Sequence, residues 1–279
     1  MRSPKRSKGR AISTGPSRRL GVAGLLADEG KVLRDMRDRL VTDGASPQGA
    51  ATALAGWFGG QLASAIASEW LVSGVGPVVD PRHVRWTVHP DLWVDGVDLG
   101  ASRNVASEHR VVVSAMVEAV DPIIEACARL ARVGRPGLWN EVGDGFAYPS
   151  VFDPPVRVTR AHLEAVEALL SVPGHPWRAR PSMRMEGDAL DGHVVLRKGG
   201  CCLAFTGSYP QPTAPDDDER AYAEAFPARA DDPDYCVTCP RRTFADCAAR
   251  QRWWRARDGA SRSDGGSLGP SAEVGHPAG

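Results

Sequence analysis

Four of the six cysteines stand in two pairs that have the composition of a metal site. One pair is adjacent and the other is a C-x-x-C: Cys201 and Cys202, then Cys236 and Cys239. Thiolates that converge on one point bind zinc or an iron–sulfur cluster. Successive side chains of an extended strand face opposite sides, so an adjacent pair converges only if the backbone turns between its members. Gly199-Gly200, directly before the pair, supply the freedom for that turn.

The spacing of the cysteines alone leaves zinc and an iron–sulfur cluster equally open. A thioredoxin-like redox role for the C-x-x-C would want a strand before it and a helix after it. Tyr235-Cys236 instead follows an acidic stretch, and the adjacent pair would have no role. Disulfides are not favoured, because the cytosol keeps thiols reduced. Of the two other cysteines, Cys127 is expected to be a buried apolar residue and Cys247 a bystander on the helix after the C-x-x-C.

The patterns that must position these cysteines predict an α+β fold. We expect a mainly helical N-terminal domain with a small antiparallel sheet, followed by a small cysteine-rich C-terminal region. Apolar periodicity and capping residues predict helices over residues 26–40, 47–71, 107–119, 121–132, 137–146 and 158–172. The fourth of these helices would begin at Asp121 as its cap, with Pro122 behind it. Alternating patterns predict two strand pairs, 83–90 with 92–100 and 182–187 with 193–198.

Composition and charge place the predicted domains. Residues 1–20 are a basic tail expected to be disordered, residues 21–178 form the main domain, 179–257 form the cluster-binding region, and 258–279 are a second disordered tail. The run between Asp43 and Glu69 has no charge, but its small residues favour a buried helix over a membrane span. The net charge of +0 gives no reason to expect a nucleic-acid partner. Without an export signal or an anchor, we expect a cytoplasmic protein with no stable membrane insertion.

The segments "RKGGCCLAF" and "YCVTCPRR" resemble the C-terminal motif of the FhuF-type ferric siderophore reductase family. The segments "VRWTVHPDLW" and "LWNEVGDGF" are similar to that family in outline. The resemblance implies a 2Fe–2S cluster as cofactor, with Cys201, Cys202, Cys236 and Cys239 as its metal ligands and no catalytic residue beyond the cluster. One departure is the spacer 203–235, which is longer than in the family. We expect a surface insertion there, because the cost of closing a loop grows only slowly with its length.

The resemblance also implies a function. A 2Fe–2S protein of this kind reduces iron(III) in ferric siderophores and releases iron(II) in the cytoplasm, so its partners would be a ferric siderophore and an unidentified electron donor, a ferredoxin-like protein or a flavoprotein reductase. No G-x-G-x-x-G follows a predicted strand, so no nucleotide site is expected. The alternative is a non-enzymatic protein whose four-cysteine site holds zinc or an iron–sulfur cluster, in a structural role or as a sensor of redox state or iron.

Cations and aromatic residues near the cysteines complete the sequence interpretation. Arg241 and Arg242 follow the second pair directly and are expected to offset the negative charge of a cluster. The docking surface for the ferric complex should lie between the main domain and the cluster. Four tryptophans are candidates for its walls, although an ordinary core position is the simpler interpretation of each: Trp86, Trp93, Trp139 and Trp177.

Overall fold

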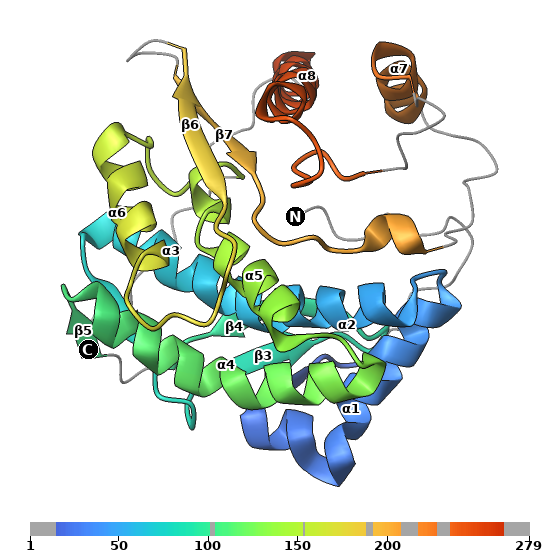
Figure 1. Cartoon of the computed structure of the whole chain (residues 1–279), viewed down its shortest axis with the longest axis vertical. Helices are drawn as coiled ribbons and strands as arrows, with labels where there is room; N and C mark the ends of the chain where they lie inside the picture. Colours follow the sequence, from blue (N-terminus) through green and yellow to red (C-terminus); the bar gives the residue numbers. More distant parts are fainter. Residues whose placement is uncertain are drawn as a thin grey trace, which may run out of the picture.

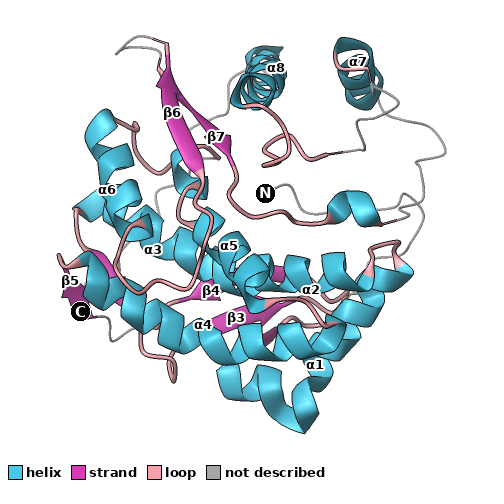
Figure 2. Ribbon diagram, in the orientation of Figure 1, coloured by secondary structure: helices cyan, strands magenta, loops and turns pink. Residues whose placement is uncertain are grey.

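The chain has an α+β fold in which helices pack around a small antiparallel sheet, as the sequence predicts (Figures 1 and 2). The computed structural model describes residues 15–100, 104–152, 154–187, 192–207, 217–227 and 235–264. Most of the predicted disordered tails, 1–14 and 265–279, lies outside these residues. The last residues of the predicted basic tail form a strand, β1 (Arg18–Leu20).

The longer helices follow the chain in the order predicted, with an additional helix in the spacer. They are α1 (Val22–Thr42, interrupted at Ala27–Gly30), α2 (Pro47–Ala55), α3 (Gln61–Ser73), α4 (His109–Ala131), α5 (Arg135–Gly145), α6 (Arg160–Leu170), α7 (Asp217–Ala225) and α8 (Phe244–Asp264). Short helical turns are η1 (Gly56–Gly60, π-helical), η2 (Tyr148–Ser150) and η3 (Ala204–Thr206).

Three small antiparallel sheets form among the described residues. The remaining strands are β2 (Gly76–Val78), β3 (Arg85–Val88), β4 (Val94–Asp98), β5 (Asn104–Ala106), β6 (Ser182–Glu186) and β7 (His193–Arg197). Strand β3 pairs with β1 and β4, β2 pairs with β5, and β6 pairs with β7. The β3–β4 and β6–β7 pairings confirm the two predicted strand pairs.

The uncharged run between Asp43 and Glu69 forms one helical stretch, α2–η1–α3, as predicted. Ser46 caps it, because its hydroxyl accepts a hydrogen bond from the backbone N–H of Gly49 at 3.0 Å. Small residues let this stretch pack closely against its neighbours, and most of it is buried. Among the described residues, no helix combines the length and apolar character needed to cross a membrane.

The prediction of two helices on either side of Asp121 is wrong. α4 runs unbroken through Pro122, and Asp121 pairs with Arg135 instead of capping a helix. A proline inside a helix removes one backbone hydrogen bond and typically costs about 3 kcal/mol. The side chains of Val120 and Ile123 are fully buried on either side of the proline. The burial of these two side chains offsets the cost of the internal proline. The proline had suggested that one helix ends and another begins at Asp121.

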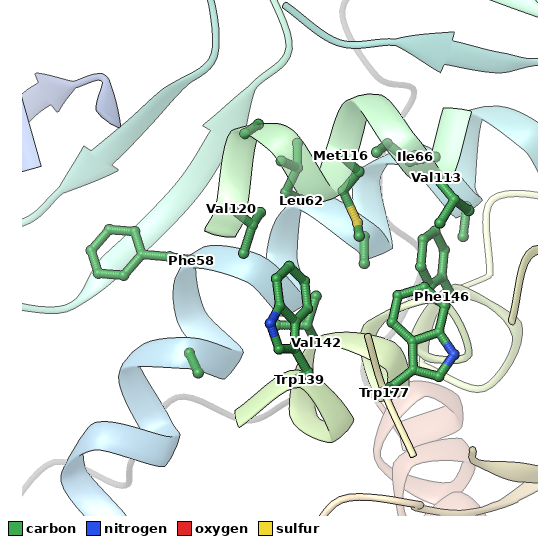
Figure 3. Close-up of a cluster of buried hydrophobic side chains, with 14 of the residues drawn as sticks. Phe58, Leu62, Ile66, Val113, Met116, Val120, Trp139, Val142, Phe146 and Trp177 are labelled. Carbon is green, nitrogen blue, oxygen red and sulfur yellow. The ribbon is translucent and has the colours of Figure 1, made fainter. Parts of the chain in front are cut away.

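The main core lies where η1, α3, α4 and α5 meet (Figure 3). The labelled side chains that fill it are Phe58, Leu62, Ile66, Val113, Met116, Val120, Trp139, Val142, Phe146 and Trp177. The same buried cluster extends to Val194 and Leu196 of β7. The buried cluster therefore contains residues from both sides of the domain boundary predicted near residue 178. The division into two domains stays a prediction.

Three of the four tryptophans proposed as docking walls belong to the core instead. Trp86, Trp139 and Trp177 expose 0%, 2% and 1% of their surface. The indole N–H of Trp86 donates to the backbone oxygen of Phe58 at 3.0 Å, and that of Trp177 donates to Leu170 at 2.9 Å. Trp93 is half-buried and stacks on His89, with 3.6 Å between the ring centroids. The simpler interpretation therefore holds for the three buried tryptophans.

The tightest approach of two helical elements tests this packing. A Cβ built on Gly145 would lie 2.3 Å from the backbone oxygen of Gly60, whereas one on Gly137, also in α5, would meet nothing within 4 Å. We expect Gly145→Ala to lower the free energy of unfolding by about 1–3 kcal/mol, because the backbones must move apart. Gly137→Ala should leave it unchanged or slightly higher. Urea denaturation measures both, and equal effects of the two variants would contradict the packing described.

Candidate metal centre

One backbone hydrogen bond joins the two segments that carry the cysteine pairs. After β7 the chain passes through Lys198 and the two glycines to Cys201 and Cys202. The backbone N–H of Lys198 donates at 2.8 Å to the carbonyl of Thr238, which lies inside the C-x-x-C. The C-x-x-C closes its own turn, because the N–H of Cys239 donates to the carbonyl of Cys236 at 3.0 Å. Residues far apart in sequence are thus held side by side.

The structure makes neighbours of all four predicted ligands. Each member of the adjacent pair meets one member of the C-x-x-C: the thiol of Cys201 hydrogen-bonds with that of Cys239, and Cys202 with Cys236. Cys236 also contacts Cys239, and every cysteine is a free thiol. No group of three or more His, Cys, Asp or Glu side chains in the described part of the chain is arranged around a common metal position.

The four thiols differ in acidity. The hydrogen bond from Cys239 lowers the pKa of Cys201 to about 6, and the Arg241 guanidinium favours the same thiolate. The hydrogen bond to Cys236, together with burial, raises the pKa of Cys202 well above its usual range. The pKa values of Cys236 and Cys239 are also raised. Cys201 is thus the thiol most readily ionised near neutral pH.

A buried ionic cluster from α5 supports the segment in front of the adjacent cysteines. The Lys198 ammonium lies 2.5 Å from Glu141 Oε2 and 3.8 Å from Asp144 Oδ2, and all three side chains are at most 4% exposed. The backbone N–H groups of Gly199 and Gly200 donate to the two oxygens of Asp144 at 2.7 and 2.9 Å. A Cβ on Gly200 would lie 2.8 Å from the backbone nitrogen of Glu141. The close approach to α5 is therefore what requires glycine at this position.

The cluster of Lys198, Glu141 and Asp144 keeps its cation charged. Burial disfavours the ammonium, but the charge of Glu141 raises the pKa of Lys198 well above its ordinary value. Burial raises the pKa of Asp144 to about 8, against the opposing effects of Lys198 and the two glycine amides. Within the cluster, Lys198 and Glu141 form the closest ion pair, at 2.5 Å.

The sequence interpretation missed this buried cluster. Glu141 and Asp144 are three residues apart, which places both on one face of α5. Lys198 directly precedes the two glycines. The two carboxylates lie in the segment "LWNEVGDGF" and the lysine lies in "RKGGCCLAF", both of which carry the family resemblance. The tertiary contact between them could not be read from either segment alone.

The two arginines predicted to offset cluster charge have different roles. Arg242 is buried and donates to the carbonyls of Cys236 at 3.2 Å and Tyr235 at 2.8 Å, and it pairs with Asp246 at 2.8 Å. It therefore fixes the backbone of the C-x-x-C. Arg241 is exposed, and its guanidinium hydrogen-bonds to the thiol of Cys201. Of the two arginines, Arg241 is the one whose charged group contacts a predicted metal ligand, Cys201.

The other two cysteines lie as expected. Cys127 is fully buried among apolar residues of α4, and burial raises its pKa to about 12. Cys247 of α8 is also fully buried, and its thiol donates to the backbone oxygen of Cys239 at 3.6 Å. A thiol engaged with a carbonyl in this way supports the second cysteine pair without being one of the four.

Helix α7 of the long spacer packs on the helix that follows the C-x-x-C. Arg250 of α8 donates to the hydroxyl of Tyr222 in α7 at 2.8 Å. The Tyr222 ring stacks on Trp254 with 5.4 Å between the centroids and meets Trp253 edge-on at 5.2 Å. The adjacent β7 is joined to α8 by Gln251, whose side-chain amide accepts from the N–H of Leu196 at 3.0 Å and donates to its carbonyl at 2.7 Å. These contacts hold α8 beside both neighbours.

Comparison of the chain with family models, with curated proteins and with solved structures returns no match. The chemistry of the site is therefore argued from its own residues. Four free thiols from two segments, with Lys198 and Arg241 close by, form a donor set suited to zinc or to an iron–sulfur cluster.

The close packing of Gly200 on α5 gives a test of the site. We expect Gly200→Ala to displace the adjacent cysteines, because the new Cβ would meet the backbone of Glu141 at 2.8 Å. The free energy of unfolding should fall by about 1–3 kcal/mol. Uptake of cobalt(II) by the apo-protein, followed through its thiolate charge-transfer absorption, should weaken.

The matched control for this variant is Gly96→Ala in β4, where a Cβ would meet nothing within 4 Å. It should bind cobalt(II) as the unmodified protein does. Normal cobalt(II) binding and normal stability in Gly200→Ala would refute the positioning role of the glycine.

Proposed function

We propose that Cys201, Cys202, Cys236 and Cys239 hold a 2Fe–2S cluster, and that the protein is a ferric siderophore reductase of the FhuF type. The observation that carries the proposal is the pairing of Cys201 with Cys239 and of Cys202 with Cys236 across two distant segments. The family resemblance favours iron–sulfur over other uses of four thiols. When bound, such a cluster supplies one-electron transfer.

The charges around the thiols suit an anionic cluster. Two ferric ions, two sulfides and four thiolates sum to minus two, and reduction makes the sum minus three. Nearby cations and hydrogen-bond donors stabilise such a group and tune its potential. The charge of Lys198 acts on Cys202 and Cys236, and the guanidinium of Arg241 hydrogen-bonds to Cys201. The residues present therefore fit the proposed cofactor.

The substrate in this proposal is iron(III) held by the hard oxygen donors of a siderophore. Reduction lowers the charge of the iron and so weakens that hold, which releases iron(II). The protein would dock the ferric complex near the cysteines and receive electrons from a ferredoxin-like protein or a flavoprotein reductase. The reaction would take place in the cytoplasm, where a reduced electron donor is at hand.

One observation favours the second candidate, a non-enzymatic protein with a structural zinc site. Cys239 is only 2% exposed and Cys247 lies buried behind it, and structural zinc sites are closed in this way. A sensor of redox state or iron would use the same four cysteines. Colour separates zinc from iron, because a 2Fe–2S protein absorbs visible light and a zinc protein does not.

The four ligands are tested by substitution. Serine in place of Cys201, Cys202, Cys236 or Cys239 should abolish cluster assembly or reduce it at least several-fold, because a ligand thiolate is lost. Cys127→Ser and Cys247→Ser are the controls and should keep the iron content, provided that the variants fold. Iron analysis and the visible spectrum measure the outcome. Iron retained after loss of both Cys236 and Cys239 would rule out the assignment.

The reaction is tested with the reduced protein. After reduction by dithionite and removal of the excess, a ferric hydroxamate siderophore should reoxidise the protein, with one iron(II) released per electron and captured by ferrozine. Bleached visible absorption should return at the same rate as iron(II) appears. A protein that forms its cluster but stays reduced with several ferric siderophores would exclude the reductase and favour the sensor.

A further inference from the structure

The buried ion pair of Lys198 and Glu141 lies beside Gly200, directly before the adjacent cysteines, where a Cβ on the glycine would lie 2.8 Å from Glu141 Oε1. Their side chains are 4% and 1% exposed, and 2.5 Å separates Nζ from Oε2. The second oxygen of Glu141, Oε1, is buried and meets no hydrogen-bond partner among the described residues. Lys198 also fixes the C-x-x-C through its backbone bond to Thr238. The residue that carries the ammonium is thus bonded through its backbone to the C-x-x-C and lies three residues before the adjacent pair.

A buried ion pair needs a reason beyond stability. Removing two charges from water is costly, and well-packed apolar residues of similar size are often as stabilising. The unpartnered oxygen of Glu141 adds to that cost. Of the four thiols, Lys198 acts electrostatically on Cys202 and Cys236, and Glu141 opposes it at Cys202. At Cys202 the pair therefore supplies both a cation and its partial compensation.

We propose that Lys198 and Glu141 are positioning residues that set the metal affinity and the reduction potential of the four-cysteine site. The ammonium stabilises the negative charge of the metal-bound thiolates, and the carboxylate limits that effect. This inference rests on the proposed function for the reduction potential, whereas the metal affinity is independent of it.

A purely structural clasp and an electrostatic role make different predictions. If the ion pair only holds the segment in place, removing either partner loosens the site, and both changes shift the metal affinity and the potential in the same direction. If charge matters, removing the cation and removing the anion have opposite effects. The sign of the two shifts therefore separates the hypotheses.

The experiment compares Lys198→Met with Glu141→Gln in the full chain. Loss of the cation should lower the reduction potential of the cluster by about 59 mV, a tenfold change for one electron. Glu141→Gln should raise the potential by less, because Asp144, 3.8 Å from the ammonium, can take over part of the pairing. The double variant should fall between them. Protein-film voltammetry gives the potentials.

Cobalt(II) binding to the apo-protein supplies a readout that needs no cluster. Lys198→Met should weaken it about tenfold, and Glu141→Gln should strengthen it. Arg252→Gln and Glu186→Gln are the matched controls, because these residues form a 2.5 Å ion pair between α8 and β6 with side chains that are 50% and 29% exposed. Both controls should leave potential and affinity unchanged.

Shifts of the same sign in the two variants, or no shift, would overturn the electrostatic role. If Lys198→Met does not fold, the near-isosteric Glu141→Gln decides the matter, and a zero or negative shift there refutes the proposal. If the unmodified protein assembles no 2Fe–2S cluster, the proposed function fails, while the cobalt(II) affinities still test the ion pair.

Discussion

The docking of Lys198–Gly200 against α5 is the contact on which the cysteine site depends. Two glycine amides donate to Asp144, and the lysine side chain reaches Glu141 on the same helix face. Helix α5 is itself in close backbone contact with η1 at Gly145. The segment Lys198–Gly200 is therefore held against the helical core. The backbone hydrogen bond from Lys198 to Thr238 then fixes the C-x-x-C relative to the same helix. A precise site can thus be built from loops, because a helix fixes one of them and that loop fixes the other.

Charge explains why polar residues occupy so buried a place. In the proposed metal site the four cysteines would ionise and concentrate negative charge, and cations nearby compensate such charge more strongly in a low-dielectric interior than in water. Lys198 provides this from the protein side, at Cys202 and Cys236, and Arg241 from the solvent side, at Cys201. The two cations differ in exposure, so salt should screen Arg241 far more than Lys198. The inner cation thereby gives the site a charge environment that does not vary with the medium.

Local signals made much of the fold predictable. The cap at Ser46 and the alternation in β3 and β4 each act within a few residues, and each gave the correct element. The cysteine pairs were recognisable for the same reason. What the sequence could not show depends on contacts between distant segments: α4 continues through Pro122 because its neighbours are buried, and Glu141 meets Lys198 only after the chain has folded. The tryptophans were ambiguous because a large aromatic suits a core as well as a docking surface.

The long spacer between the cysteine pairs does not have to shape the site. Its two ends are fixed independently of its length: the adjacent pair by α5, and the C-x-x-C by Thr238 and by Arg242, which bonds to its backbone. Once both ends are held, a longer connection adds only the slowly growing entropy of closing a loop. The hydrogen bond between Arg250 and Tyr222 holds α7 of the spacer on α8 and offsets part of that entropy cost. Gln251 also bonds α8 to β7, the strand that leads to the adjacent cysteines. The spacer therefore packs on a helix that is already fixed next to the site.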